Sequence, residues 1–551
     1  MILGVEINKK AIGSKELFRG LSFVLQQGEK VAIVGRNGVG KTTLFNILTG
    51  NDSYFDGDIT KGKGLRIAAT LQEFHALGQK SCIDYILDNL PEYRTLQDIL
   101  NEHPKSMGHD SAMISVYTDA IERFTQLGYY DIHDKILQGL EAYQITPDQS
   151  ELPFASLSGG QKRFADLVRV ELSDADLALV DEPTNHMDYV GKEAFIQWLK
   201  GAKHAIAVIT HDRDVLAHVD RIIEIKDKQA FSFPGNYNGY LRQNSVTTVN
   251  QITDFETAQR TLQNLQKQID AARTKKFAAP PDTAKKFRIM EDRLQRQYDE
   301  LERRVQKPSF WIDQESVTQM SEKVSDSYHK YKAKNIRIGR HQNGSFIRDL
   351  LIVRNLSLGY TQPLFDDISF TLSSGSQIQI KGRNGAGKTT IIRAILSATA
   401  GEQLASRVFA GEIVSNPRLE IGFYEQEIDE KYLSLSLSEA IAQTYYDKSV
   451  PINDQRVKQI LSNYLFDPVL DGKLTVAQLS GGQKARLQII KMLCNKPNLL
   501  VLDEPTNHLD LPSVEELEKA LANYSGAILY VSHDTYFAKN FEAEVVQIGP
   551  V

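Results

Sequence analysis

The chain repeats one set of motifs, in the same order, in its two halves. GRNGVGKT begins at Gly35 and returns as GRNGAGKT at Gly382, and LSGGQ begins at Leu157 and again at Leu479. From LSGGQ onward, through DEPTNH and a later histidine, the two copies stay 322 residues apart. The 551-residue chain also exceeds the roughly 250 to 300 residues at which one hydrophobic core stops growing. The repeat therefore predicts two related domains, each with its own core.

Each glycine-rich motif stands between an apolar strand pattern and a helix pattern. VAIVGRNGVGKTTLFNIL and QIQIKGRNGAGKTT both indicate strand, turn and helix, which is the setting of a phosphate-binding loop. Glycines let backbone N–H groups close around phosphate oxygens, and the helix presents its positive end to them. We therefore expect α/β domains that bind a nucleotide, which from one loop alone could be GTP as well as ATP. The loop residues expected to bind it are Gly35, Asn37, Gly38, Gly40, Lys41, Thr42 and Thr43 in the first half, and Gly382, Asn384, Gly385, Gly387, Lys388, Thr389 and Thr390 in the second.

Carboxylates follow an apolar strand pattern in both halves. LALVDE ends in Asp181 and Glu182, and LLVLDE ends in Asp503 and Glu504. Each Asp, with Thr42 or Thr389, is expected to hold Mg²⁺ and its water shell, because Mg²⁺ prefers oxygen ligands. Each Glu is expected to orient or deprotonate the attacking water in phosphoryl transfer.

His211 and His533 are the expected contacts to the γ-phosphate. A lone Asp-Glu pair is more often a solvated turn, and a lone histidine is more often a surface or core residue. Here each Glu lies 24 residues after the serine of LSGGQ, and each His lies 29 residues after the Glu. The matched spacing favours the catalytic interpretation of Glu182, Glu504, His211 and His533.

Composition excludes several classes of protein. The chain is 41% hydrophobic and 24% charged with a net charge of -6, as in ordinary globular proteins. It has no run of roughly 18 apolar residues that would cross a bilayer, and its start lacks the apolar core of a signal peptide. The distant Cys82 and Cys494 suggest neither a zinc site nor a disulfide framework. We expect a cytoplasmic protein without a membrane partner.

The segment between the two halves differs in charge from the rest of the chain. Residues 241–340 hold 20 Lys or Arg against 13 Asp or Glu, whereas the remainder holds 44 against 57. Apolar residues recur there every three or four positions, from Phe255 to Ala272 and at Phe287, Met290 and Leu294, before the spacing loosens. Such a seam, interrupted by Pro280 and Pro281, predicts an antiparallel helical hairpin.

The turn of this hairpin is basic. Its candidate RNA-binding residues are Lys275, Lys276, Lys285, Lys286 and Arg288. A solvated helix face explains such charges about as well as a polyanion partner does. We expect a first nucleotide-binding domain at residues 1–240 with a short helical arm at about 85–140, a basic helical linker at 241–345, and a second domain at 346–551.

These motifs resemble the ATP-binding cassette superfamily, in which LSGGQ of one domain closes over ATP held by the phosphate loop of the other. The resemblance implies ATP and Mg²⁺ at two composite sites of a monomer whose cassettes pair within the chain. It adds Gln72 and Gln426 as ATP-binding and metal-site residues. It also adds Ser158, Gly160, Ser480 and Gly482 at the γ-phosphate of the opposite site.

The resemblance also assigns adenine recognition. Tyr360 matches the aromatic residue that stacks on adenine, although core packing is an alternative for it. The first half has no aromatic at Ile12 or Gly13, so adenine recognition there is absent or falls to a residue such as Phe18.

Two cassettes joined by a long basic helical linker, together with DEPTNHMD, DEPTNHLD and FPGNYNGY, are similar to the F subfamily of the superfamily. That similarity implies an ATP hydrolase that binds ribosomes under ATP control. Its linker tip would reach tRNA and ribosomal RNA near the P-site tRNA and the peptidyl-transferase region, and hydrolysis would drive release.

Two functions inside the subfamily stay open: protection of ribosomes from antibiotics, and relief of stalled translation. Outside it, the alternatives are the ATPase subunit of a membrane transporter and a DNA-repair cassette ATPase.

Overall fold

The computed structural model divides the chain into two units. One comprises Met1–Tyr237 and Asn335–Val551, and the other Asn238–Lys334. Within the first unit we call residues 1–237 the first cassette and residues 349–549 the second cassette. The structure describes all residues except 14, 72–79, 107, 109, 186, 306–310, 312, 314–324, 326, 327, 329–348, 401–405, 426, 427, 508, 523, 550 and 551.

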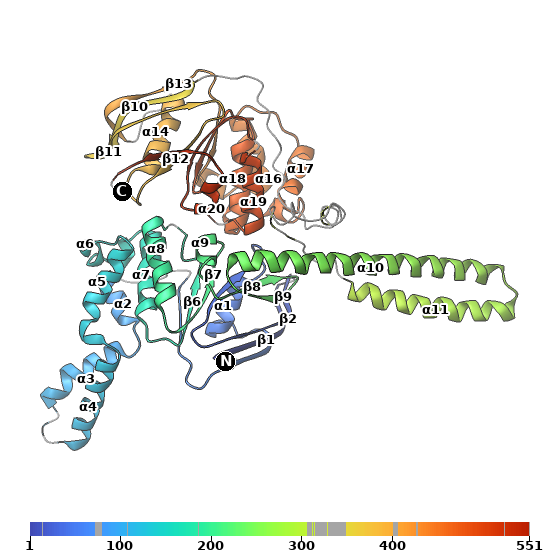
Figure 1. Ribbon diagram of the computed structural model, residues 1–551, viewed down its shortest axis with the longest axis horizontal. Helices are drawn as coiled ribbons and strands as arrows, with labels where there is room; N and C mark the ends of the chain where they lie inside the picture. Colours follow the sequence, from blue (N-terminus) through green and yellow to red (C-terminus); the bar gives the residue numbers. More distant parts are fainter. Residues whose placement is uncertain are drawn as a thin grey trace. The chain divides into compact units, whose positions relative to one another are not determined.

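In the described part of the first cassette, the strands form an antiparallel sheet and a mainly parallel sheet (Figure 1). The strands are β1 (Leu3–Ile12), β2 (Lys15–Leu25), β3 (Lys30–Val34), β4 (Asp56–Lys61), β5 (Ile67–Ala69), β6 (Leu177–Asp181), β7 (Ala205–Ile209), β8 (Arg221–Lys226) and β9 (Gln229–Pro234). The antiparallel sheet has the order β2-β1-β4 and the mainly parallel sheet the order β5-β6-β7-β3-β8-β9. Only the β8–β9 pair in the second of these runs antiparallel.

The parallel sheet brings the predicted motifs to one edge. The phosphate loop follows β3, the Asp-Glu pair ends β6 and His211 follows β7, and β7 pairs with both β6 and β3. Because parallel strands end at the same edge, these segments meet although they are far apart in sequence. The strands β3 and β7 are buried along their whole length, which explains their unbroken apolar sequences.

Helices complete the first cassette. They are α1 (Lys41–Thr49), α2 (Cys82–Asp88), α3 (Tyr93–Ser106), α4 (Ser111–Gln126), α5 (Ile132–Ala142), α6 (Pro147–Ser150), α7 (Gly159–Leu172), α8 (Tyr189–Gly201) and α9 (Arg213–Leu216). The paired α3 and α4 fall within residues 85–140, where the sequence predicts an arm. The rings of Tyr93, Phe124 and Tyr129 pack at their base with centroids 5.3 to 6.0 Å apart.

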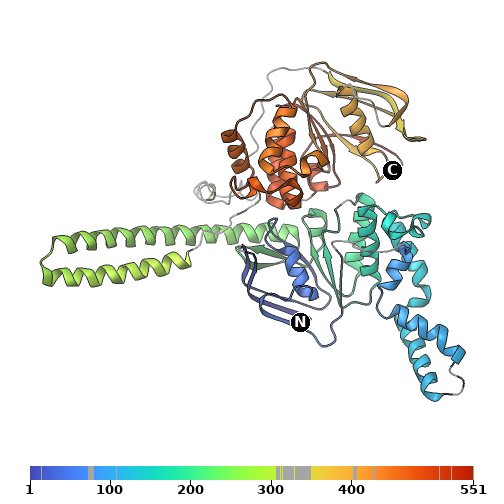
Figure 2. The same cartoon turned by 180° about the vertical axis from the view of Figure 1, so that it is seen from behind.

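The second cassette repeats this architecture (Figure 2). Its strands are β10 (Asp349–Gly359), β11 (Pro363–Ser373), β12 (Gln377–Lys381), β13 (Arg407–Ser415), β14 (Ile421–Tyr424), β15 (Leu499–Asp503), β16 (Ala527–Val531) and β17 (Glu544–Gln547). Its helices are α14 (Lys388–Ala400), α15 (Glu430–Leu433), α16 (Leu437–Asp447), α17 (Asp454–Asn463), α18 (Gly481–Leu493), α19 (Leu511–Ala522) and α20 (Thr535–Lys539). The sheet orders are β11-β10-β13 and β14-β15-β16-β12-β17. The α/β fold with paired P-loop domains is thus confirmed.

The second unit contains a helical hairpin of α10 (Tyr237–Ala278) and α11 (Pro281–Arg304). Ile269, Ala272 and Leu294 are buried between the helices, as the predicted seam requires. The prediction for Met290 is wrong, because its side chain is 49% exposed. Its neighbour Glu291 takes the inward position instead.

The heptad spacing of the α11 seam continues after Leu294 in residues that are only partly buried. Counted from Phe287, it runs through Glu291, Leu294, Tyr298 and Leu301 at alternating steps of four and three. The apolar pattern of the sequence did not identify Glu291 as a seam residue, because its side chain is a carboxylate. In the described part of the chain, no helix is both long and apolar enough to pass through a membrane.

Candidate functional site

The two phosphate loops hold their lysines in the same way. Lys41 Nζ donates to the carbonyl oxygen of Gly35 at 2.7 Å, and Lys388 Nζ donates to that of Gly382 at 2.8 Å. Gly40 has φ 103°, and a Cβ there would lie 2.9 Å from Phe18 Cζ. The equivalent glycine of the second loop would meet the ring of Phe365 at the same distance. Glycine is therefore required by both backbone conformation and packing.

A hydroxyl and a carboxylate meet behind each loop. Thr42 Oγ1 donates to Asp181 Oδ2 at 3.0 Å, and Thr389 Oγ1 donates to Asp503 Oδ2 at 3.0 Å. Each pair joins the start of the helix after the loop to the end of β6 or β15. Oxygen donors of this kind suit Mg²⁺, which keeps several water and phosphate ligands. The pairs thus fit the predicted metal sites.

The glutamates after these carboxylates have an unusual backbone. Glu182 has φ 47° and Glu504 has φ 49°, in the left-handed region that non-glycine residues seldom occupy. Such a conformation costs on the order of 1–3 kcal/mol and concentrates at functional sites. It places Glu182 Oε1 3.8 Å from His211 Nε2 and Glu504 Oε1 3.4 Å from His533 Nε2. The predicted catalytic pairs therefore come together in both cassettes.

Burial controls the charge of these groups. It raises the pKa of Glu182 to about 8 and that of Glu504 to about 7, because desolvation disfavours the carboxylate. Burial, with a nearby lysine acting in the same direction, lowers the pKa of His211 and of His533 to about 3. Both imidazoles are neutral near pH 7, whereas each glutamate is poised to exchange a proton.

The LSGGQ serines begin helices. Ser158 Oγ accepts from the N–H of Gln161 at 3.2 Å, and Gln161 Oε1 accepts from the N–H of Ser158 at 3.0 Å. Ser480 caps α18 through the same reciprocal contacts. In this capping box the backbone N–H groups of the serine and the glutamine are hydrogen-bonded to side chains. The backbone N–H groups of the two glycines between them lie at the positive end of the helix. The motif therefore presents amide donors suited to an anion.

The aspartates that end DEPTNHMD and DEPTNHLD tie the cassettes together. Asp510 Oδ2 accepts from the N–H of Asn37 at 3.2 Å, and Asp188 Oδ2 accepts from the N–H of Asn384 at 2.8 Å. Each aspartate thus contacts the phosphate loop of the opposite cassette. Neither aspartate is among the site residues predicted from the sequence. Their repetition in both motifs was the available signal.

Two cavities lie where the cassettes meet. Cavity two, of about 690 Å³, is lined by Lys388, Thr389, Thr390 and Tyr360 of the second cassette and by Ser158 and Gly160 of the first. Cavity one, of about 190 Å³, is lined by Asn37, Glu182 and His211 of the first cassette and by Ser480, Gly482, Glu504 and His533 of the second, so it touches the Glu-His pairs of both cassettes. Each LSGGQ segment therefore faces the opposite phosphate loop. We call the nucleotide sites at these places site one, with the first phosphate loop, and site two, with the second.

Known proteins match the chain over its whole length. Residues 18–185 and 365–507 match the family described as ABC transporter, and residues 223–319 match another family of that description. YdiF of Bacillus subtilis is 30% identical over 100% of this chain and 80% of its own. The chain belongs to the F subfamily of the ATP-binding cassette superfamily.

Further relatives agree with this membership. YheS of Escherichia coli K12 is 31% identical over 96% of this chain and 76% of its own. ABC transporter F family member 5 of Arabidopsis thaliana is 28% identical over 98% of this chain and 74% of its own. The archaeal ribosome recycling factor aABCE1, solved with ribosomal stalk protein aP1, has the same fold, with TM-score 0.57, 16% identity, and coverage of 99% of this chain and 87% of its own.

The remaining predicted residues of the ABC-F sites divide into several groups. Thr43 lies half-buried on α1 beside Thr42, and Gly38 lines cavity one, as Asn384, Gly385 and Gly387 line cavity two. Gln72 and Gln426 fall outside the described residues. Phe18 is fully buried beneath Gly40, so the alternative that it stacks on adenine is wrong.

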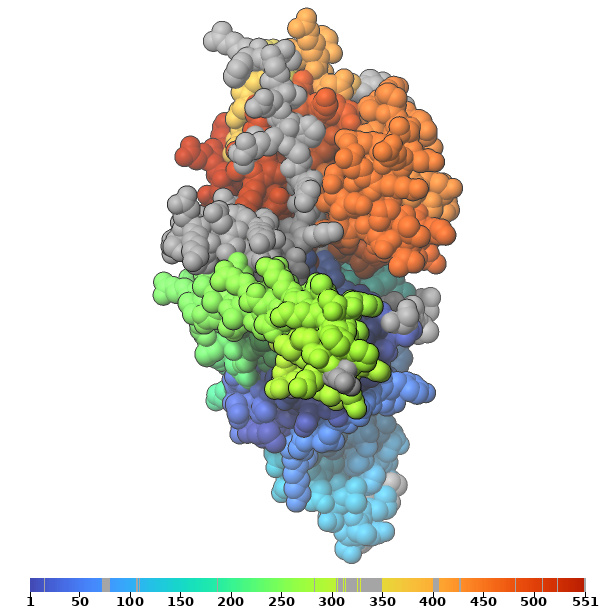
Figure 3. All heavy atoms as spheres, turned by 90° about the vertical axis from the view of Figure 1, so that its right-hand side faces the viewer, coloured from blue at the N-terminus to red at the C-terminus, as the bar shows by residue number. Residues whose placement is uncertain are grey.

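The basic residues at the hairpin turn are not equivalent. Lys275, Lys285, Lys286 and Arg288 are exposed, whereas Lys276 is partly buried and donates to Glu291 Oε2 at 2.5 Å. Figure 3 looks onto the hairpin, where the surface atoms come from α10 and α11 in green and yellow-green. The exposed lysines and arginine leave their charge available to a partner, while Lys276 has a structural contact.

Proposed function

We propose that this ABC-F chain is an ATP hydrolase that binds and cleaves ATP at both composite sites as a monomer. This proposal rests on one observation: each LSGGQ segment faces the opposite phosphate loop, most completely in cavity two. Lys388 binds the terminal phosphates, Tyr360 stacks on the base, and the amides after Ser158 bind the γ-phosphate. Glu504 orients and deprotonates the attacking water, and His533 contacts the γ-phosphate.

Mg²⁺ fits both sites through Thr42 with Asp181 and Thr389 with Asp503. When bound, the ion would neutralise charge that develops on the phosphate oxygens. Gln72 and Gln426 complete the proposed ligand sets.

We further propose that the chain acts in the cytoplasm on ribosomes, which it binds in an ATP-dependent way. The hairpin tip reaches toward the P-site tRNA and the peptidyl-transferase region, and hydrolysis drives release. The exposed cations Lys275, Lys285, Lys286 and Arg288 support contact with a polyanion. Structural relatives are a ribosome recycling factor and a ribosome-bound ABCE1. The action is protection from antibiotics or relief of stalled translation.

Co-sedimentation with ribosomes tests this proposal. The Glu182→Gln, Glu504→Gln double variant should pellet with ribosomes in ATP but not in ADP, because blocked hydrolysis keeps the cassettes closed. Equal recovery in both nucleotides, or none in either, would contradict ATP-dependent binding. Recovery with membrane subunits instead would favour a transporter ATPase.

Charge reversal locates the contact. Lys275→Glu with Lys285→Glu in that double variant should weaken co-sedimentation, increasingly so as salt is raised. The matched control is Lys267→Glu with Arg296→Glu, which makes the same charge change at exposed positions on the body of the hairpin. A loss of binding that is equal in the two pairs would place the contact elsewhere than at the tip.

A further inference from the structure

Lys192 lies at the meeting of the two cassettes and contacts both. It is the fourth residue of α8, and its side chain is only 7% exposed. Its Nζ donates to Asp214 Oδ2 at 3.0 Å and lies 2.9 Å from Asp212 Oδ2, both in the first cassette. The same Nζ donates to the carbonyl oxygen of His533 in the second cassette at 2.6 Å. One ammonium group therefore joins the segment after His211 to the backbone of His533.

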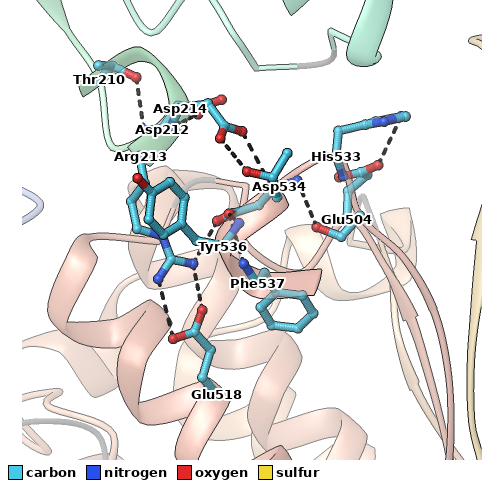
Figure 4. A network of polar contacts seen from close by, with 12 residues as sticks. Thr210, Asp212, Arg213, Asp214, Glu504, Glu518, His533, Asp534, Tyr536 and Phe537 are labelled. Carbon is cyan, nitrogen blue, oxygen red and sulfur yellow. Dashed lines mark hydrogen bonds and ion pairs between the residues drawn. The ribbon is translucent and has the colours of Figure 1, made fainter. Parts of the chain in front are cut away.

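Neighbours of Lys192 also link the two cassettes. Figure 4 shows Arg213 of the first cassette facing Glu518 and Asp534 of the second, with Asp214 beside it. Arg213 Nη2 lies 2.5 Å from Glu518 Oε1 and 2.9 Å from Asp534 Oδ2. Asp214 also accepts a hydrogen bond from the hydroxyl of Thr535. Although burial opposes its charge, Asp212 and Asp214 raise the pKa of Lys192.

The second cassette has no matching cation at the related position. Residues 192 and 514 are 322 apart, the spacing of the repeat, and each is the fourth residue of its helix. Val514 is 3% exposed and lines cavity one, as His211 does. A valine side chain has no donor for the carbonyl oxygen of His211. The two histidine segments are therefore supported by different chemistry.

We propose that Lys192 is a positioning residue for site two, supplied in trans by the first cassette. By holding the carbonyl oxygen of His533, it fixes the backbone that places the ring of His533 3.4 Å from Glu504. Closure of the cassettes delivers this contact, so site two becomes competent for hydrolysis only when the cassettes meet. Site one has no such requirement at Val514. This inference rests on the proposed hydrolysis of ATP.

The test measures each site separately. Glu182→Gln leaves only site two active, and Glu504→Gln leaves only site one. Adding Lys192→Met should lower kcat at least about tenfold in the Glu182→Gln chain, because a hydrogen bond from a charged donor is lost. KM for ATP should change by less than about twofold, since Lys192 does not contact a phosphate loop. The same addition should change kcat of the Glu504→Gln chain much less.

Further variants guard against a general loss of structure. Lys192→Arg keeps the charge and should restore part of kcat at site two, and Lys192→Met with Asp214→Asn removes one of the carboxylates left unpaired. Lys200→Met changes an exposed lysine on the same helix and should leave both sites unchanged.

An equal fall of kcat at both sites, or no fall at site two, would overturn the assignment to site two. Failure of the proposed function gives a different result, because the unmodified chain would then release no phosphate from ATP at all.

Discussion

Site one and site two share their phosphate chemistry and differ in what surrounds it. Both have a lysine held by loop carbonyls, a threonine bonded to an aspartate, and a strained glutamate beside a neutral histidine. Cavity two has a volume typical of small-molecule sites and is lined by Lys388, Thr389 and Tyr360, whereas the smaller cavity one is lined by the Glu-His pairs of both cassettes. Gly482 lies close against Asn37 there.

The comparison separates the phosphate chemistry of a nucleotide site from base recognition and coupling to the opposite cassette. Phosphate binding and water activation need a fixed set of groups at fixed positions, so the repeat preserves them. Recognition of the base and coupling to the opposite cassette use side chains outside that set. These are the places where the two copies of this chain diverge, at Tyr360 and at Lys192.

The largest expected effect is on hydrolysis. Replacing both glutamates, Glu182→Gln with Glu504→Gln, should lower kcat by about 100-fold or more, because each site loses its general base. Phosphate release under saturating ATP measures this. Of the single variants, Glu504→Gln should cost more activity, since Lys388, Thr389 and Tyr360 of site two line a cavity of about 690 Å³ that suits a nucleotide. Equal losses from the two single variants would mean that the sites work alike.

A smaller effect is expected on base recognition at site two. Tyr360→Leu in a Lys41→Ala chain, which retains only site two, should weaken ATP binding about tenfold, because base stacking contributes roughly 1–3 kcal/mol. The preference for ATP over GTP should decrease as well. Binding is measured by titration with a fluorescent ATP analogue.

Tyr54→Leu is the control for Tyr360→Leu, since Tyr54 is 88% exposed and does not line cavity two. Unchanged affinity and base preference after loss of Tyr360 would assign it a packing role instead.

The smallest expected effect is on stability. Because the pKa of Glu182 is raised to about 8, the folded chain keeps a proton that the unfolded chain releases. Without nucleotide, stability should therefore fall between pH 6.5 and 8, and Glu182→Gln should remove about 1.5 kcal/mol of that fall. The depressed pKa of His211 acts below pH 6.5, outside this window.

Thermal midpoints at pH 6.5 and 8 measure this effect, with Glu141→Gln, an exposed position on α5, as the control. An identical pH dependence in the unmodified chain and in Glu182→Gln would show that Glu182 is already ionised.

Local patterns were enough to predict much of the site. The strand, turn and helix around Lys41 and the carboxylates after apolar strands depend on neighbours in sequence, and parallel pairing then brings them together. The contacts of Asp188, Asp510 and Lys192 with the opposite cassette depend on how two separate domains meet. The repetition of Asp188 and Asp510 in both motifs marked these two residues without showing what they contact, and Lys192 has no counterpart in the second copy that would mark it.

Phe18 and Met290 show how a correct pattern gives a wrong residue. Phe18 lies near the expected position of an adenine-stacking aromatic, but its ring packs directly beneath Gly40. Met290 is the more apolar of two adjacent residues, yet Glu291 lies in the seam because two cations stabilise it there. Pairing with opposite charges overrode hydrophobicity.

Glu291 also affects how α10 and α11 are held relative to each other. Its carboxylate is held by Arg273 at 3.0 Å and Lys276 at 2.5 Å, both on α10, inside an otherwise apolar seam. Sliding α11 along α10 by one heptad would separate the carboxylate from both cations. The two ion pairs therefore favour one register of the hairpin. A fixed register keeps the turn at a constant distance from the base of the two helices.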